Sequence, residues 1–481
     1  MVERVLHRGG AGIIAIMATI AYIVIQLRRY ATFQLGMDLG LFGQAVRGYA
    51  QGHAPLASIK TPDGFNLLGD HFTPIVALLA PFYRIWPDTR VLLIGQAILF
   101  GAGVWIIGQI AVRRLGVKLG LFIAVAVAFS WGFVHAILFD FHEIAFAVPV
   151  LALALLCVTK ERWAGLIICT ILLWLTKEDC TFITAGIGLT LIARKKYWQG
   201  LVMGAASVIA FFLLTKVIIP PLSYSGRYTY FKVVDSQPIW QTLGTNITSS
   251  AFVIFMLVLV GTLGLGLASP TALTLIPIVA SRLVSSDPIY FRIQHHYNAP
   301  VMVICFMAII EVWARLRDRQ SAFSNDVSNE LTLPKQGILA RAGKLDFARI
   351  LFGIQAFLLV AVIIFGIAII LKLGNLERTP ETCVRCQELD IACSLIPPDA
   401  RVAGDAYVVP HLVDTAIPSM AIPEWEDQVG EPLDPDWVIL DTVSTADGNL
   451  TNHWEYNMTL TLPSMGYHEV WSGDIVSVWS R

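Results

Sequence analysis

Long apolar runs dominate the chain, and short polar segments separate them. Eleven runs approach the length of about 20 residues that a helix needs to cross a bilayer. They cover approximately residues 11–27, 91–111, 119–138, 144–158, 163–176, 181–193, 200–219, 250–268, 271–286, 298–314 and 350–372. The pattern therefore predicts an α-helical polytopic membrane protein with about eleven transmembrane helices.

Some of these runs differ from a regular span. The fourth, fifth and sixth runs are short, so we expect tilted pairs or partly re-entrant helices there. Ala268-Ser269-Pro270 predicts a tight turn between two runs, because proline has no N–H for a continuing helix. No small-residue cleavage pattern follows the first run, so it is expected to remain as a membrane anchor.

Basic residues in the short loops indicate an orientation, since cytoplasmic loops of membrane proteins are rich in Lys and Arg. An N-terminus in the cytoplasm places most of these residues on the cytoplasmic side: Arg113, Arg114, Lys118, Lys160, Arg162, Arg194, Lys195, Lys196 and those of segment 315–349. Arg28 and Arg29 oppose the rule locally. The expected location is the plasma (inner) membrane, and an odd number of spans places the C-terminal region outside the cytoplasm.

The pattern divides the chain into two expected domains. Residues 1–373 form a transmembrane bundle with a long first extracytoplasmic loop, 28–90, and a cytoplasmic loop, 315–349, whose polar part from Ser321 to Lys344 is expected to be flexible. Residues 374–481 form a small extracytoplasmic soluble α/β domain. Here Arg401–Gly404 and Trp437–Leu440 predict buried strands, and Val470–Trp479 predicts a terminal hairpin.

Composition agrees with a membrane protein and excludes one class of partner. Only 14% of the residues are charged, against about 25% in soluble domains. The net charge is -1, so no basic field favours nucleic acid. The bilayer itself is the first expected partner.

Carboxylates, histidines and cations gather in the loops that this topology places outside. These are Asp38, Asp70, His71, Asp140, His142, Glu143, Lys177, Glu178, Asp179, Arg282, Arg292, His295, His296 and Tyr297. Charged groups that persist near a bilayer usually line a polar cavity or pair with one another. We expect the turns that carry them to surround one outward-facing pocket.

Each cluster also has a plain structural interpretation. Leu39, Phe42 and Val46 recur at helical spacing, and Asp38 would then be the N-cap of a short amphipathic helix. The turns 139–143 and 177–179 would cap helices and neutralise their own charges. A divalent metal ion is another possibility, although adjacent histidines are a weak signal for one.

Several segments resemble a family of predicted bacterial membrane proteins of unknown function. The segments are MDLGLFGQ, GFNLLGDHFTPI, FDFHE, TKED and HHY, between Gln34 and Tyr297, with IPPDARVAGDAYVVPHL near the C-terminus. That family is grouped with the GT-C glycosyltransferases, which take sugars from polyprenyl-phosphate carriers. The resemblance implies a GT-C-like fold, a polyprenyl-phosphate-linked sugar donor and an unknown glycan, lipid or protein acceptor.

By the same resemblance, Asp38 corresponds to the catalytic aspartate of the superfamily, which would act as a general base. Lys177, Arg282, Arg292 and the His295-His296 pair are candidates to hold the leaving phosphate. The remaining acidic and histidine residues would bind the sugar or a divalent cation. Two alternatives stay open: a transporter or flippase for a lipid-linked substrate, and a non-enzymatic scaffold for envelope assembly.

Three cysteines cluster after the last apolar run. Cys383 and Cys386 form a Cys-x-x-Cys pair, and Cys393 follows. A redox pair or half of a zinc site is possible, but no second such pair completes a zinc site. Outside the cytoplasm a structural disulfide is the favoured interpretation, with one thiol left over.

Overall fold

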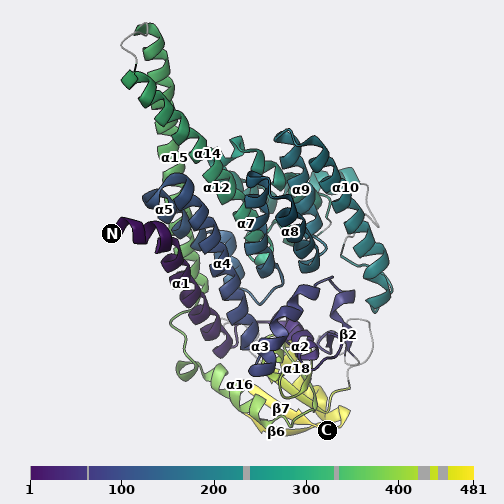
Figure 1. Cartoon of the computed structure of the whole chain (residues 1–481). Helices are drawn as coiled ribbons and strands as arrows, with labels where there is room; N and C mark the ends of the chain where they lie inside the picture. The colour runs from purple at the N-terminus through teal and green to yellow at the C-terminus, as the bar shows by residue number, and fades with distance from the viewer. Residues whose placement is uncertain are drawn as a thin grey trace.

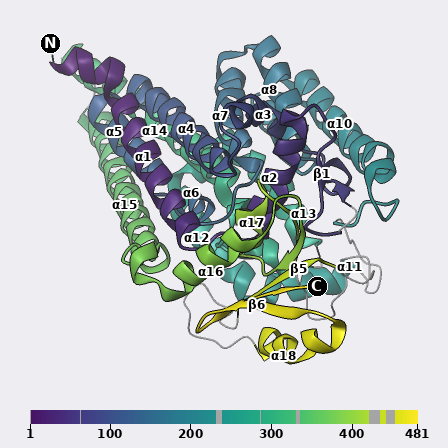
Figure 2. The same ribbon diagram turned by 90° about the horizontal axis from the view of Figure 1, so that it is seen from below.

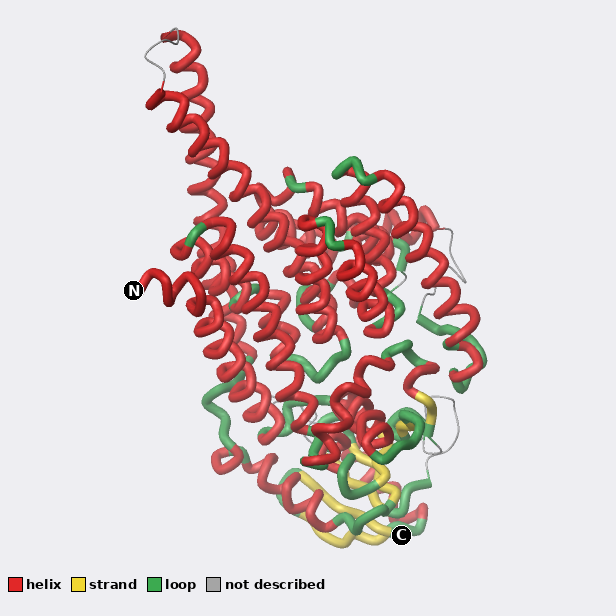
Figure 3. Tube along the Cα trace, viewed as in Figure 1, coloured by secondary structure: helices red, strands yellow, loops and turns green. Residues whose placement is uncertain are grey.

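A computed structural model describes residues 2–61, 64–230, 239–285, 287–329, 335–420, 434–441 and 453–481. The chain is mostly helical, as Figure 3 shows, with a small sheet near the C-terminus. The α-helices of the first half are α1 (Val2–Ala31), α2 (Met37–Ala50), α3 (Ala80–Ile85), α4 (Arg90–Leu115), α5 (Val117–Ala128), α6 (Trp131–Ile137), α7 (Ile144–Lys160), α8 (Trp163–Thr176), α9 (Cys180–Ala193) and α10 (Tyr197–Leu213). The second half contains α11 (Ile239–Thr248), α12 (Ser250–Leu263), α13 (Leu275–Leu283), α14 (Ala299–Asn329), α15 (Lys335–Leu373), α16 (Val384–Leu395), α17 (Val409–Leu412) and α18 (His453–Thr461).

Apolar helices long enough to cross a membrane number six in the described part of the chain. They are Gly9–Ala31, Arg90–Leu115, Tyr197–Leu222, Ser250–Ala268, His296–Arg319 and Ile350–Leu373. Five shorter apolar helices accompany them, among them α7, α8 and α9, which the sequence also predicts to be short. The protein is thus a multi-helix membrane protein, and the number of eleven spans stays a prediction.

The run 119–138 is not one straight helix. Helices α5 and α6 are bent by 43° at a break, because Ser130 takes an extended backbone conformation between them. The predicted turn at Ser269-Pro270 is confirmed: Ser269 is also extended, and its hydroxyl accepts the N–H of Thr271.

The expected cytoplasmic loop is largely helical. Residues 315–329 continue α14 and residues 335–349 begin α15, so these two helices extend beyond the bundle in Figure 1. The expectation of a flexible loop at 321–344 was therefore wrong for 321–329 and 335–344, and residues 330–334 lie outside the described residues. The segment lacks apolar periodicity, but its Ala, Leu, Lys and Arg residues are strong helix formers, which is sufficient for helix.

Small residues allow the helices of the bundle to approach closely. Gly108 of α4 faces α5, and a Cβ at this position would lie 2.8 Å from the Cβ of Ala124. Large side chains such as Phe100, Phe133 and Phe306 fill the space between the other helices and are fully buried. Close packing through small residues is a common way to hold membrane helices together, since lipid tails provide no hydrophobic drive for their association.

A five-stranded mixed sheet lies at one end of the bundle, which we call the sheet end. Its strands are β3 (Arg401–Gly404), β4 (Ile417–Met420), β5 (Trp437–Asp441), β6 (His468–Ser472) and β7 (Val476–Ser480). Their order is β4-β3-β5-β7-β6, with β3 parallel to β4 and β5, and β7 antiparallel to its neighbours. The two predicted strands and the terminal hairpin are confirmed, whereas the division of the chain at residue 373 stays a prediction.

The sheet packs against the segment that joins α1 to α2, as Figure 2 shows from the sheet end. Phe33 of this segment is fully buried in the same apolar cluster as Val402, Ile439 and Val478 of the strands. A two-stranded ladder, β1 (Leu56–Ala57) and β2 (Phe65–Asn66), lies further along the same loop. The expected long first loop, 28–90, is thus folded and contains α2, α3 and this ladder.

The pair Arg28-Arg29, which opposes the charge rule in the sequence, has a structural role. The Arg28 guanidinium donates to the carbonyls of Leu376 and Arg378, and Arg29 donates to the carbonyl of Leu373 at 2.7 Å. Leu373 is the last residue of α15, and Leu376 and Arg378 follow it; carbonyls at the C-terminal end of a helix lack partners and favour positive charge. The two arginines therefore join the ends of the first and last long helices.

The favoured interpretation of the cysteine cluster is confirmed. Cys383 and Cys386 form a disulfide, and Cys393 remains a free thiol. Cys383 is also the N-cap of α16, where its sulfur accepts the N–H of Cys386.

Candidate functional site

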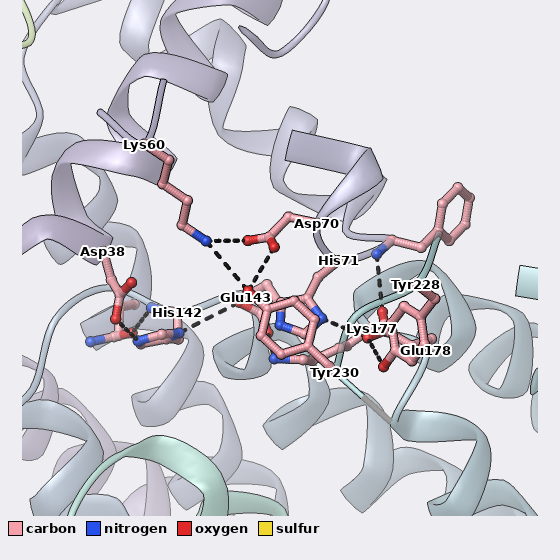
Figure 4. A network of polar contacts seen from close by, with 12 residues as sticks. Asp38, Lys60, Asp70, His71, His142, Glu143, Lys177, Glu178, Tyr228 and Tyr230 are labelled. Carbon is pink, nitrogen blue, oxygen red and sulfur yellow. Dashed lines mark hydrogen bonds and ion pairs between the residues drawn. The ribbon is translucent and has the colours of Figure 1, made fainter. Parts of the chain in front are cut away.

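Five segments that are far apart in sequence meet at the sheet end of the bundle. They are the start of α2, the described residues of the loop 60–72, the turn 139–143 before α7, the turn 177–179 between α8 and α9, and the residues around Arg282 and His296. Figure 4 shows the polar contacts that join most of them. The turns 139–143 and 177–179 lie on the same side, because Glu143 Oε1 is 3.0 Å from Lys177 Nζ.

Asp38 does not cap its helix. The N-cap of α2 is Gly36, and Asp38 lies in the first turn with 28% of its side chain accessible. Asp140 does the capping from another segment, since its carboxylate accepts the N–H of Gly36 at 2.7 Å and that of Asp38 at 3.2 Å. The N-cap interpretation was therefore wrong, and the carboxylate of Asp38 is free to contact His142 instead.

A chain of alternating charges begins at Asp38. Its Oδ2 lies 3.3 Å from Nε2 of His142, and Nδ1 of His142 lies 3.6 Å from Oε2 of Glu143. The second oxygen of Glu143 faces Lys177. His142 is held in place because Gln96 accepts its backbone N–H at 2.9 Å. Glu143, His142 and Lys177 are all buried.

This chain sets the ionisation of its members. Burial opposes the charge on Asp38, but the hydrogen bond and positive charge of His142 outweigh it and lower the pKa of the carboxyl. Burial likewise opposes the charge on His142, and the contacts with Asp38 and Glu143 still raise its pKa to about 9. Asp140 accepts two N–H groups but is buried beside Asp38, so its pKa rises to about 6.

A second cluster surrounds Glu178. This buried carboxylate accepts the N–H of Phe72 at 3.0 Å and the hydroxyl of Tyr228 at 2.8 Å, and lies 2.6 Å from His71 Nδ1. Burial opposes its charge, but His71 and Lys177 lower the pKa of Glu178 to about 2. The first loop and the turn 177–179 are thus tied together by one carboxylate.

A third cluster contains Asp70. Lys60 Nζ is 2.6 Å from one carboxylate oxygen, and the hydroxyl of Tyr230 donates to the other at 2.6 Å. The ring of Tyr230 stacks on His71 with centroids 4.0 Å apart, so the second and third clusters touch.

A cavity opens beside these clusters, between α9, α13 and the start of α14. It encloses about 790 Å³ of space that no atom occupies, part of it open to solvent. Lys177, Asp179, Arg282, His296, Tyr228, Tyr230, Tyr290, Tyr297, Ser281, Ser285, Ile144, Cys180, Phe182, Ile183, Ile278, Pro300 and Val301 line it. The wall is apolar with a few convergent polar groups, as is typical of a small-molecule site.

The residues between Arg282 and Asn298 do not all take part in the site. Arg282 is buried in the wall of the cavity and donates to the Asn298 side chain and the Tyr297 carbonyl. The ring of His296 stacks on His142 with centroids 3.4 Å apart, and neither of its nitrogens has a hydrogen-bond partner in the described structure. His295 has a positive φ of 72° and contacts Phe139, whereas Arg292 is exposed and does not line the cavity.

The polar groups do not converge as metal ligands would. In the described residues no group of three or more His, Cys, Asp or Glu side chains could hold a metal ion. Each major carboxylate faces a cationic or donor partner instead: Asp70 faces Lys60, Glu143 faces Lys177, and Glu178 faces His71. The observed arrangement does not fit the metal alternative, and no step below uses one.

Sequence reasoning missed several members of the site. Lys60, Tyr228, Tyr230 and Gln96 all contact predicted residues, but none of them belongs to a charged cluster in the sequence. The pair Tyr228-x-Tyr230 next to a span was the one available signal, because tyrosines favour membrane interfaces.

Comparison with known proteins places the chain in a family. Residues 29–465 match the family described as Predicted membrane protein (DUF2079). The chain belongs to this family. No curated protein matches the DUF2079 chain in a sequence search.

Two solved structures resemble the DUF2079 chain in fold. ArnT from Cupriavidus metallidurans bound to undecaprenyl phosphate has a TM-score of 0.55 and 13% identity, and the match covers 97% of both chains. The apo state of the same protein has a TM-score of 0.53 and 14% identity, with 98% of both chains covered. At this identity the likeness shows a shared fold.

Proposed function

We propose that this protein is a membrane glycosyltransferase that moves a sugar from a polyprenyl-phosphate carrier to an acceptor. The sheet end is then the extracytoplasmic face, and the N-terminus is cytoplasmic. One observation carries the proposal: two buried cations, Lys177 and Arg282, line a cavity between apolar helices, and a chain of ionic contacts through Glu143 and His142 joins Lys177 to the carboxylate of Asp38. The shared fold supports it, since the ArnT structure contains undecaprenyl phosphate.

The cavity suits the phosphate and the lipid of such a carrier. Burial opposes the charge on Lys177, but Glu143 and its neighbours raise the pKa well above its usual value, so the ammonium persists. The guanidinium of Arg282 is permanently charged. Cations in a dry site stabilise a phosphate most strongly as it leaves and gains charge. Ile183, Ile278 and Val301 provide an apolar wall for the first isoprene units.

Asp38 is the proposed general base. It stays ionised at neutral pH, because the cationic His142 lowers its pKa. In the step, the acceptor oxygen bonds to the anomeric carbon, the bond from that carbon to the phosphate oxygen breaks, and the acceptor proton passes to Asp38. In-line displacement of this kind inverts the anomeric centre.

The remaining clusters are suited to hold the sugar. Tyr228 and Tyr230 line the cavity, and their hydroxyls are oriented by Glu178 and Asp70. Asp179 also lines it; burial and the adjacent Glu178 raise its pKa, so it is better able to donate as a neutral acid. Oriented hydroxyl and carboxyl groups are the usual partners of sugar hydroxyls.

The test is a transfer assay in membranes with a radiolabelled polyprenyl-phosphate sugar. Asp38→Asn keeps the size and removes the base, so turnover should fall by about 100-fold or more. Asp436→Asn is the matched control, since this aspartate pairs with Arg401 at the exposed surface of the sheet. Its turnover should equal that of the wild type.

The assay also separates the alternatives. Unchanged turnover in Asp38→Asn would remove its assigned role. A flippase would move the labelled lipid between leaflets without breaking its bond to the sugar, so labelled lipid recovered intact in every variant would favour transport over transfer.

A further inference from the structure

The segment between α1 and α2, residues 32–36, leads directly to Asp38. Residues of the sheet end pack around this segment. Phe33 has a positive φ of 50°, a conformation that bulky residues rarely adopt. Such a backbone persists only where its surroundings hold it. The surroundings here belong to the C-terminal region of the chain.

Aromatic stacking provides the first contact. His411 of α17 stacks on the ring of Phe33, with centroids 3.9 Å apart, and on the ring of Tyr30, with centroids 4.1 Å apart. Two nearly parallel rings at this distance must occupy opposite faces of the imidazole. Burial lowers the pKa of His411 to about 3, and its Nε2 has no hydrogen-bond partner in the described structure. It therefore acts here as a neutral flat ring.

Polar contacts from α16 form the second set of contacts with the segment 32–36. Arg385 is buried, and it donates to the carbonyl of Phe33 at 3.3 Å while its other nitrogens pair with Asp441 at the end of β5. The sulfur of Cys386 lies 3.6 Å from the carbonyl oxygen of Thr32. The Cys383–Cys386 disulfide thus flanks Arg385 at the first turn of α16.

The loop after β3 contacts the other side of the segment 32–36. A Cβ on Gly36 would lie 3.9 Å from the carbonyl oxygen of Ala406 and 3.2 Å from the Asp140 carboxylate. Gly36 is therefore held between this loop and the aspartate that caps α2. The backbone has little freedom from Thr32 to the N–H of Asp38.

We infer that the C-terminal region positions Asp38 for the reaction by clamping the segment 32–36, with His411 and Arg385 as positioning residues. This rests on the proposed function for its effect on rate. Neither residue touches the cavity. Their influence passes through the backbone, where a displacement of about 1 Å at a reacting group is sufficient to slow a reaction 100-fold.

The test compares His411→Ala with His411→Phe in the full-length protein. The alanine removes both stacks, and the phenylalanine restores a flat ring without losing a hydrogen bond. The transfer kcat should fall about tenfold in His411→Ala and return to within about twofold of wild type in His411→Phe. The KM for the donor lipid should stay unchanged in both. Arg401→Ala, on the exposed side of the same sheet, is the control.

Hydrogen exchange of the peptide 32–40 provides a readout that needs no transfer activity. Exchange should accelerate about tenfold in His411→Ala and not in His411→Phe or Arg401→Ala. Faster exchange in a protein that transfers no sugar would leave the clamp standing and overturn the proposed function. Wild-type exchange and kcat in His411→Ala would overturn the clamp, and so would a loss of activity that His411→Phe fails to restore.

Discussion

Two ionic clusters lie at opposite ends of the bundle, one half-buried and one buried, and their carboxylates differ in how completely they are hydrogen-bonded. At the end remote from the sheet, Glu311 Oε2 accepts from Arg194, Ser269 and Thr271 at 2.6–2.8 Å, and Oε1 faces Arg315. At the sheet end, both oxygens of Glu143 and both nitrogens of His296 lack a geometrically good hydrogen bond in the described structure.

The difference indicates that the Glu311 cluster stabilises the fold and that the sheet-end cluster is suited to bind a ligand. The carboxylate of Glu311 is saturated, because both of its oxygens face donors, so it joins helices and has no acceptor left for a ligand. Glu311 joins α14 to the turn before α13 and to the end of α9 in this way. A buried group without its full set of partners costs free energy unless something else repays it. At the sheet end, His296 lines the cavity, so a ligand is its expected partner.

Removal of the cation at the sheet end should have the largest effect. Lys177→Met takes away a charge from the cavity wall and should lower kcat/KM for transfer by about 100-fold or more. It also removes the nearer of the two cations that face the buried Glu143, leaving only His142, at a cost of up to about 3–5 kcal/mol. The double variant Glu143→Gln, Lys177→Met removes that burial cost. It should recover thermal stability and stay inactive, and recovered activity would contradict a role for Lys177 with the phosphate.

The pH dependence of kcat/KM for transfer should be bell-shaped. Cationic His142 is present below its pKa of about 9 and is lost above it, so kcat/KM should fall about tenfold per pH unit beyond that value. Asp140 accepts its two N–H groups as a carboxylate, so activity should also fall below pH 6, where it takes up a proton. Initial rates between pH 5 and about 10 check both limbs, and a flat profile across pH 9 would exclude the cationic form of His142 from the mechanism.

The variant Tyr230→Phe should lower transfer activity less than Lys177→Met does. This variant keeps the ring that stacks on His71 and removes the hydroxyl that donates to Asp70. We expect a three- to tenfold rise in the KM for the donor with little change in kcat, because one oriented hydroxyl contributes about 1 kcal/mol to binding. Steady-state kinetics measure it, and a fall in kcat alone would place Tyr230 in the chemical step instead.

The smallest effect on activity should come from the saturated cluster. Arg194→Met removes one donor to Glu311, which should lower the thermal midpoint by a few degrees, for a cost of about 1–3 kcal/mol. Transfer per folded molecule should equal that of the wild type. Loss of activity at unchanged stability would mean that the remote cluster also takes part in function.

The sequence predicts the elements of this molecule better than their contacts. Apolar runs identify the helices, and the spacing of Leu39, Phe42 and Val46 correctly predicts α2. Local pattern does not reveal that Asp140, about a hundred residues away, caps that helix. Long-range partners such as Lys60 and Tyr230 are equally invisible, because single polar residues in a loop show no periodicity.

The predicted turns meet for a topological reason, but of the predicted residues only Lys177, Asp179, Arg282, His296 and Tyr297 line the cavity. Turns at the same end of neighbouring helices must lie close together, so the turns 139–143 and 177–179 meet. Arg292 is exposed outside the cavity lining, because proximity in sequence to Arg282 does not fix which way a side chain points. The bend between α5 and α6 escaped detection, since Ser130 interrupts a run that stays apolar on both sides.

The affinity for undecaprenyl phosphate tests the contrast between the two clusters most directly. Purified wild type, Lys177→Met and Arg194→Met are compared by native mass spectrometry or by titration in nanodiscs. The account predicts binding of one lipid per chain, at least tenfold weaker (~1.4 kcal/mol) in Lys177→Met and unchanged in Arg194→Met. Equal affinity in all three proteins, or equal loss in both variants, would contradict a lipid-phosphate site at the sheet end.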